Sequence, residues 1–332
     1  MRYVPVMKAI RVHSVGGPEV LRFEDAPEPD PKTLKAGEAL VRHRAAGVNF
    51  IDIYHRSGLY PQKAPFIPGV EGAGVVESVG PDVESLKPGD RVAYAGPIGG
   101  YAETRLIAAD RLVKLPDDIS DEQAAAMMLQ GMTVDMLIRS VWPLHAGDTI
   151  LIHAAAGGVG LIMCQWAAAL GATVIGAVSS DEKAELARAH GCHHAIVYSK
   201  QDFVAEVARL TDGKKLPVVY DSVGRDTFVR SLDCLQKRGL MVSFGQSSGP
   251  VEPFAPGLLA QKGSLYLTRP TLFDYISTRE ELERSAASLF DAVRTGKVKV
   301  DIGQRFTLSE AAEAHRALES RKTVGSTILT VE

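Results

Sequence analysis

The sequence predicts an α/β protein in which a doubly wound parallel sheet follows a compact, mostly β region. Between residues 149 and 268, short apolar segments alternate with amphipathic segments of helix length, which is typical of parallel strands and crossover helices. A glycine-rich turn joins the first of these strands to a helix. Gly and Pro instead punctuate short β-branched segments from residue 8 to residue 118, which indicates β structure with tight turns.

The expected elements follow in order along the chain. The first region has β-branched strand candidates at residues 39–43, 74–79 and 91–94, and a long helical stretch covers 121–139. The parallel sheet is expected from strands at 149–153, 173–178, 194–197, 217–221, 239–244 and 264–268, with helices at 158–170, 181–190 and 225–237. After residue 270 we expect a charged helix at 277–294, a strand at 298–302, a helix at 309–320 and a strand at 326–331. These last elements are predicted to return to the first domain.

Length and composition exclude several classes of protein. A chain of 332 residues fits about two domains, and 45% hydrophobic with 23% charged residues is ordinary globular usage. Lys and Arg number 37 against 40 Asp and Glu, a net charge of −3. This balance argues against a nucleic-acid partner and against an anionic membrane surface.

The cysteine content indicates a reduced compartment. Cys164, Cys192 and Cys234 are odd in number and far apart, which argues against a disulfide framework and a multi-cysteine zinc lobe. No apolar run is long enough to span a bilayer, and the N-terminus lacks a signal-peptide pattern. We therefore expect a cytoplasmic protein.

The turn after residue 153 is the most informative segment. It reads Ala-Ala-Ala-Gly-Gly-Val-Gly over residues 154–160 and leads into an apolar helix. Against the G-x-G-x-x-G pattern, Ala155 replaces the first glycine, whereas Gly157 and Gly160 keep the second and third. Such a turn lets a pyrophosphate approach the N–H groups of a helix N-terminus. The alternative is a strand-to-helix turn without a ligand, which the alternating pattern around it disfavours.

The end of the second sheet strand indicates which cofactor binds. A carboxylate there favours NAD, but this chain offers the hydroxyls of Ser179 and Ser180 and the cation of Lys183. We therefore predict NADPH. The alternative is purely structural, because Ser179 with Glu182 fits a capping box and Lys183 fits a solvated helix surface.

Four phrases together identify a family. They are Gly47-Val-Asn-Phe-Ile-Asp-Ile-Tyr-His-Arg-Ser-Gly-Leu-Tyr60, Pro68-Gly-Val-Glu-Gly-Ala-Gly-Val-Val-Glu-Ser-Val-Gly80, His153-Ala-Ala-Ala-Gly-Gly-Val-Gly160 and Asp221-Ser-Val-Gly224. The chain resembles the NADPH-dependent quinone oxidoreductases, the zinc-free, zeta-crystallin-like branch of the medium-chain dehydrogenase/reductase superfamily. The resemblance covers nearly the whole chain.

The resemblance implies a domain arrangement. A Rossmann NADPH-binding domain, residues 127–270, is inserted into a GroES-like catalytic domain formed by residues 1–126 and 271–332, and the chemistry lies in the cleft between them. The superfamily's zinc enzymes use Cys with His or Glu ligands, but this chain has Asn49 and Val70 at those places and no cysteine before Cys164. We therefore expect no metal.

The resemblance also implies a cofactor site. The residues near the nicotinamide would be Asn49, Ile53 and Tyr54, with Gln130 and Thr133 behind them. The pyrophosphate would be held by Gly157, Gly158, Val159 and Gly160, and the 2′-phosphate by Ser179, Lys183, Tyr198 and Arg321. The rest would be lined by Ser222, Phe244, Gly245, Gln246, Ser247, Thr271 and Leu272. For Arg321 the alternative is a cation at a helix end on the surface.

Reduction of a quinone needs a positioned ring and stabilisation of developing oxyanion charge more than acid–base groups. We assign Tyr54 and Tyr60 to the quinone ring and Arg56 to the charge. The alternatives are packing for the tyrosines and an ion pair with Asp52 for Arg56.

Two other functions stay open. One is an NADPH-dependent reductase of activated C=C bonds, such as enones and alkenals, which shares the fold and the cofactor. The other is an NADPH-binding protein with little turnover. The family also implies a homodimer that forms through the edge of the cofactor sheet, where residues 264–268 form an apolar strand.

Overall fold

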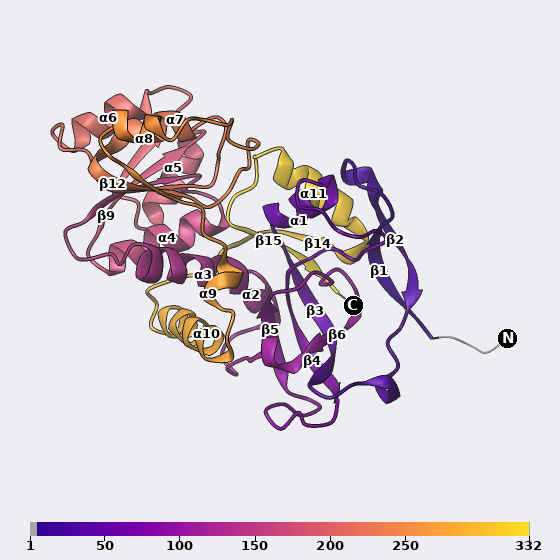
Figure 1. Ribbon diagram of the computed structural model, residues 1–332. Coiled ribbons are helices and arrows are strands. Elements are labelled where there is room, and N and C mark those ends of the chain that lie inside the picture. Colours follow the sequence, from indigo (N-terminus) through magenta and orange to yellow (C-terminus); the bar gives the residue numbers. More distant parts are fainter. Residues whose placement is uncertain (1–4, 332) are drawn as a thin grey trace. The chain divides into compact units, whose positions relative to one another are not determined.

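The computed structural model describes residues 5–331 of the chain. These residues form two compact units, which Figure 1 shows as ribbons. Unit 1 comprises Met1–Met132, Ile276–Phe290 and Val300–Glu332, and unit 2 comprises Thr133–Tyr275 and Asp291–Lys299. The boundaries expected at residues 126 and 270 stay predictions, and no sequence pattern indicated that residues 291–299 join unit 2.

Unit 1 is built on antiparallel β structure. A two-stranded ribbon, β1–β2, accompanies a seven-stranded sheet of order β14-β15-β3-β4-β5-β7, in which β6 also pairs with β3. Its strands are β1 (Val6–Val12), β2 (Leu21–Pro27), β3 (Glu38–Val48), β4 (Glu71–Val79), β5 (Arg91–Ala95), β6 (Thr104–Ala108), β7 (Val113–Lys114), β14 (Ile302–Thr307) and β15 (Ser326–Thr330). The helices are α1 (Phe50–Ser57), α2 (Asp121–Ala125) and α11 (Ala311–Glu319), and α3 (Met128–Asp135) and α10 (Arg279–Arg294) run on into unit 2.

The C-terminal segment completes this sheet. Strand β15 pairs antiparallel with β3, so that Thr327 lies opposite Val48, and β14 pairs parallel with β15. The predicted return to the first domain is therefore confirmed, and the chain that forms unit 2 is an insertion into unit 1.

Unit 2 is a doubly wound parallel sheet, as the sequence predicts. Its strand order is β10-β9-β8-β11-β12-β13, and every neighbouring pair is parallel. The strands are β8 (Thr149–His153), β9 (Thr173–Val178), β10 (His194–Val197), β11 (Leu216–Asp221), β12 (Leu235–Ser243) and β13 (Tyr266–Thr268). The helices are α4 (Gly158–Ala169), α5 (Asp181–Ala189), α6 (Phe203–Leu210), α7 (Phe228–Ser231), α8 (Gly257–Gln261) and α9 (Leu272–Tyr275). This strand order reverses between β8 and β11, where such sheets bind ligands.

Three sequence predictions about elements are wrong. The helix expected at 225–237 is the short α7, because β12 already begins at Leu235 and its exposed polar start hides the strand pattern. The strand expected at 298–302 lies too early, since β14 begins at Ile302. The single helix expected at 121–139 is divided into α2, α3 and a π-helical turn, Met136–Val141.

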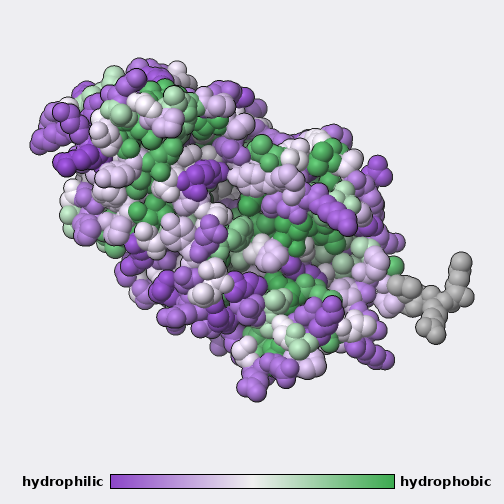
Figure 2. Space-filling model, in the orientation of Figure 1, coloured by the Kyte–Doolittle hydropathy of each residue, from purple (hydrophilic) through white to green (hydrophobic). Residues whose placement is uncertain are grey.

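Unit 2 has a buried apolar core and also carries hydrophobic residues on its surface (Figure 2). Buried side chains of β8, β9, β11 and α6 form one apolar cluster, which includes Leu151, Ile175, Val207 and Val219. Figure 2 also shows hydrophobic residues on the surface of unit 2, over the part where α7, α8 and β12 are labelled in Figure 1. No helix within residues 5–331 is long and apolar enough to cross a membrane.

Candidate active site

The glycine turn of unit 2 stands at the carboxyl end of β8. Gly157 is the N-cap of the twelve-residue helix α4, whose first turn carries no acidic residue. An added Cβ at Gly157 would meet a single atom within 4 Å, the Ala154 oxygen at 3.4 Å, whereas at Gly160 it would overlap that oxygen. Gly157 therefore leaves room for a ligand, and Gly160 lets the helix pack against the turn. The positive helix end suits an anion.

The missing first glycine is compensated within the sheet. Ala155 is fully buried, and a Cβ on Gly176 of β9 would lie 2.7 Å from its methyl group. The Ala155 methyl group therefore fits because Gly176 of the neighbouring strand has no side chain. The left-handed backbone conformation in this turn occurs at Ala154, whose φ is +56°.

Two of the predicted 2′-phosphate residues of unit 2, Ser179 and Lys183, lie directly after β9. Ser180, not Ser179, is the N-cap of α5, because its side chain accepts from the Lys183 N–H at 3.3 Å. The capping box predicted for Ser179 and Glu182 is therefore wrong. Lys183 is half-buried, and burial lowers the pKa of its ammonium group.

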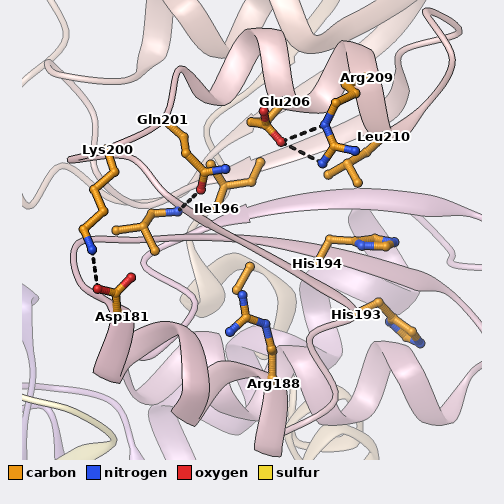
Figure 3. A pocket seen from close by; sticks show the side chains of 12 residues that line it. Asp181, Arg188, His193, His194, Ile196, Lys200, Gln201, Glu206, Arg209 and Leu210 are labelled. Carbon is orange, nitrogen blue, oxygen red and sulfur yellow. Dashed lines mark hydrogen bonds and ion pairs between the residues drawn. The ribbon is translucent and has the colours of Figure 1, made fainter.

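Charged side chains from α5 and from the segment after β10 line an exposed groove along the edge strand β10. The groove has a volume of about 380 Å³, and Figure 3 shows Arg188 pointing into it from α5. Asp181 pairs with Lys200 on one wall. Of the two carboxylates in the first turn of α5, Asp181 and Glu182, the first is thus paired with Lys200. Tyr198, 46% exposed, follows β10 directly.

The ends of β11 and β12 bring the next predicted residues together. The Ser247 N–H donates to the Ser222 oxygen at 3.1 Å, and a Cβ at Gly245 would lie 2.7 Å from that oxygen. Phe244, Gln246 and the other members of this group are half-buried. Thr271 and the buried Leu272 follow β13 at the start of α9, and Thr133 belongs to α3. Arg321 is exposed in unit 1, after α11, with φ of +57°.

Two of the predicted nicotinamide residues, Asn49 and Gln130, belong to a buried hydrogen-bond network in unit 1 at the start of α1. The Asn49 amide donates to Glu71 Oε2 at 2.7 Å and accepts from Gln130 Nε2 at 3.1 Å. The Gln130 oxygen in turn accepts from the Ser326 hydroxyl at 2.6 Å. These four side chains come from four separate segments, so the orientation of the Asn49 amide is fixed from both sides.

Two buried carboxyl groups accompany this network. Burial raises the pKa of Asp52 to about 7 and the pKa of Glu71 to about 8. Hydrogen bonds from Asn49 and Tyr101 to Asp52 act in the opposite direction. The sequence prediction missed Glu71, although an acidic residue between Val70 and Gly72 in an apolar segment is a recognisable signal.

Arg56 is held inside unit 1. Its guanidinium donates to both carboxylate oxygens of Glu319, at 2.5 and 3.2 Å, and to the Gly16 oxygen at 3.1 Å. It also donates to His315 Nδ1 at 3.2 Å. The ion pair with Asp52 that the sequence suggested is therefore wrong, since the partner is Glu319. Most donors of Arg56 are used, which favours a structural role.

The bond from Arg56 also fixes the direction of a longer chain of hydrogen bonds. Because His315 Nδ1 accepts, its Nε2 carries the hydrogen and faces Tyr101 Oη at 3.2 Å. Tyr101 donates onward to Asp52 at 3.0 Å. Burial lowers the pKa of His315 to about 3, so this imidazole is neutral at neutral pH.

The predicted substrate tyrosines lie in an aromatic cluster. The rings of Tyr54 and Tyr60 meet edge to face with centroids 5.2 Å apart, and His55 contacts Tyr60 at 6.1 Å. Tyr54 and Ile53 are 8% and 7% exposed, and Tyr60 is half-buried. His55 was not predicted, and its Nδ1 is buried without a hydrogen-bond partner within residues 5–331.

The donor set does not fit zinc. Asn49 stands in the Cys position, and its amide is bound to Glu71 and Gln130. All three cysteines lie in unit 2 and are buried. In the part of the chain that the structure describes, no group of three or more His, Cys, Asp or Glu side chains could hold a metal ion.

Comparisons with known proteins agree with this geometry. Residues 35–117 match the alcohol dehydrogenase GroES-like domain family, and residues 158–291 match the zinc-binding dehydrogenase family. The quinone oxidoreductase of Pseudomonas aeruginosa is 55% identical over 328 residues, which are 97% of this chain and 99% of the relative. The 2-haloacrylate reductase of a Burkholderia species is 44% identical and covers 98% of both chains.

A solved structure shows the same fold. The quinone oxidoreductase of Escherichia coli, crystallised with NADPH, matches with a TM-score of 0.95 and 49% identity over 97% of this chain and 99% of that chain. The glycine turn, the parallel sheet and these similarities agree. The chain therefore belongs to the quinone oxidoreductases of the medium-chain dehydrogenase/reductase superfamily.

Proposed function

We propose that this chain is an NADPH-dependent quinone reductase that works without a metal or a flavin. The observation that carries the proposal is the open Gly157 turn at the switch point of a parallel sheet, in a chain 55% identical to a quinone oxidoreductase. An E. coli relative binds NADPH, and the residues here fit that cofactor.

Each unit contributes its own binding groups in this proposal. The N–H groups of residues 157–160 in unit 2 bind the pyrophosphate, and Ser179, Lys183 and Tyr198 bind the 2′-phosphate with Arg321 of unit 1. Asn49, Ile53, Gln130 and Thr133 lie near the nicotinamide. The remaining contacts come from Ser222, Phe244, Gly245, Gln246, Ser247, Thr271 and Leu272.

Bound NADPH supplies hydride, and the chain has to orient the acceptor and keep water from the reduced ring. Tyr54 and Tyr60 hold the quinone by ring contacts, with their edge-to-face pair 5.2 Å apart as the platform. One hydrogen of the hydroquinone arrives with the hydride, and the remaining proton comes from solvent. Arg56 stabilises unit 1 and takes no part in the charge stabilisation assigned to it from sequence.

One observation favours a second activity. The 2-haloacrylate reductase relative acts on an activated C=C bond by its name and is 44% identical to this chain. A reductase of enones and alkenals is therefore the second candidate. A chain that only binds NADPH is the third.

An acceptor screen tests these functions. The purified chain is mixed with NADPH and, in parallel, with 1,4-benzoquinone, 1,4-naphthoquinone or a simple enone, and NADPH oxidation is followed by absorbance. We expect fast oxidation only with quinones. Faster oxidation with the enone would favour the second candidate, and no acceptor-dependent oxidation would favour binding alone.

We also propose a homodimer in the cytoplasm. The edge strand β13 exposes Tyr266 and Leu267, 62% and 37% accessible, and Val229 on α7 is 47% accessible. Hydrophobic side chains at an unpaired sheet edge favour pairing with a second copy. Light scattering of the purified chain checks this, with a monomer as the contradicting result.

A further inference from the structure

Glu71 is a titratable group that the proposed mechanism does not use. It is the first residue of β4, and its side chain is fully buried in unit 1. Its carboxyl group lies against Gly47 of β3, where an added Cβ would overlap Oε2. A buried carboxyl group costs free energy unless it is fully hydrogen-bonded, so its surroundings require an explanation.

All the hydrogen-bond partners of Glu71 are donors. Oε1 accepts from the Leu129 N–H at 2.8 Å, and the Met128 N–H also contributes. Oε2 accepts from the Asn49 amide at 2.7 Å. A protonated carboxyl group would find no acceptor among these groups, so the geometry suits the carboxylate.

Burial works against that carboxylate. Burial raises the pKa of Glu71 to about 8, and the charge of Asp52 adds to the rise. The three N–H donors lower it only in part. Above about pH 8, where Glu71 is ionised, the free protein therefore holds a poorly compensated negative charge, and a cation placed nearby would compensate it and favour the ionised form at lower pH.

The hydrogen bond from Asn49 to Glu71 indicates which cation would compensate the Glu71 carboxylate. Gln130, which is itself held by Ser326, donates to the far side of the Asn49 amide. The amide therefore cannot rotate, and its orientation depends on Glu71. We propose that Glu71 is a positioning residue that acts through Asn49 and stabilises the oxidised, cationic nicotinamide ring relative to the reduced ring. The inference rests on the proposed function, which places Asn49 beside that ring.

The charge balance explains why this helps the reaction. Two electrons and one proton leave the reduced ring as hydride and reach the quinone, and a second proton comes from solvent. The products are hydroquinone and a ring with one positive charge. Stabilisation that appears only as this charge develops accelerates the transfer.

The test compares the affinities of the two cofactor forms. Kd values of NADP⁺ and NADPH are measured by titration calorimetry for the wild-type chain, Glu71→Gln and Glu71→Asp, at about pH 9, where the carboxylate is ionised. Glu71→Gln should raise the ratio of the NADP⁺ Kd to the NADPH Kd about tenfold. Tenfold equals about 30 mV in the potential of the bound couple. Glu71→Asp keeps the charge and should keep most of the ratio.

Asp52→Asn is the matched control. Asp52 is equally buried, but it accepts from the main-chain N–H of Asn49 at 2.9 Å and not from its side chain. We expect a smaller change of the ratio than with Glu71→Gln. If Glu71→Gln fails to fold by circular dichroism, Asn49→Ala carries the test, because it removes the amide link and should shift the ratio in the same direction.

The outcomes separate this inference from the proposed function. An unchanged ratio in folded Glu71→Gln, or an equal shift in Asp52→Asn, would overturn the role of Glu71 while wild-type turnover of quinone still supports the function. A wild-type chain that binds neither cofactor form would overturn the proposed function itself.

Discussion

The two units differ in how they build the places to which the proposed function assigns cofactor binding. Unit 2 offers main-chain groups and the absence of side chains, at Gly157, Gly160 and the compensating Gly176. Unit 1 offers a buried network of polar side chains around Asn49 and Glu71. The glycine turn of unit 2 tolerates changes of neighbouring side chains but no Cβ at Gly160, whereas the network of unit 1 depends on each partner being present.

We expect the largest effect from a variant that disturbs the glycine turn of unit 2. Gly160→Ala places a Cβ against the Ala154 oxygen, a main-chain atom that cannot move aside. We expect the free energy of unfolding to fall by about 3 kcal/mol or more, with loss of NADPH binding. Chemical denaturation measures this. Gly257→Ala on α8 is the control, because nothing lies within 4 Å of its added Cβ; equal losses would contradict the steric explanation.

The second effect tests the buried side chains of unit 1. Arg56→Leu removes a guanidinium whose side chain is 3% exposed and leaves Glu319, 34% exposed, without its partner. The free energy of unfolding should fall by about 3 kcal/mol. The exposed pair of Arg316 with Glu313 gives the control, since Arg316→Leu should cost less than about 1 kcal/mol. Similar costs for both variants would refute a structural role for Arg56.

The third effect is a pH dependence from the two carboxyl groups. Burial raises the pKa of Asp52 to about 7 and that of Glu71 to about 8, above their unfolded values of roughly 4. The folded state therefore binds more protons, and its stability is lost as pH rises. Between about pH 6.5 and 8 we expect a loss on the order of 2 kcal/mol.

Urea denaturation across that pH range measures the slope. His43 and His315, whose pKa values burial lowers to about 4 and about 3, are neutral in the folded state across this range. Unfolded histidines, with a pKa of roughly 6.5, add a smaller slope of opposite sign, which the wild-type chain and Asp52→Asn share. Asp52→Asn should flatten the slope. A slope that is flat in the wild-type chain would contradict the raised pKa values.

The smallest effect concerns cofactor choice. Lys183→Ala removes a half-buried cation at the start of α5, and kcat/KM for NADPH should fall about tenfold. The value for NADH should stay unchanged. Steady-state kinetics with both cofactors decide, and a parallel fall with NADH would assign Lys183 to the stability of the helix.

The difference between the units also explains what the sequence could predict. Strand β8 and the glycine turn are local patterns, so the parallel sheet and the position of residues 157–160 follow from the sequence alone. The resemblance brought Asn49 and Tyr54. Contacts between distant segments could not be predicted from the sequence, because no local sequence pattern links Arg56 with Glu319 or Glu71 with Asn49.

The wrong predictions have the same origin. The start of strand β12, Leu235–Lys237, was assigned to a helix, and Gln236 and Lys237 are exposed there. A polar edge of a strand has no period that separates it from an amphipathic helix. Likewise, either of two adjacent serines fits the cap pattern, and only the hydrogen bond from Lys183 identifies Ser180 as the N-cap.

The most direct test of the account is quinone-dependent oxidation of NADPH compared with NADH by the purified chain. The glycine turn of unit 2, together with Lys183, predicts oxidation that is at least about tenfold more efficient with NADPH than with NADH. The aromatic cluster of unit 1 predicts that this oxidation requires 1,4-naphthoquinone. Equal efficiency with NADH, or no oxidation when quinone is added, would contradict it.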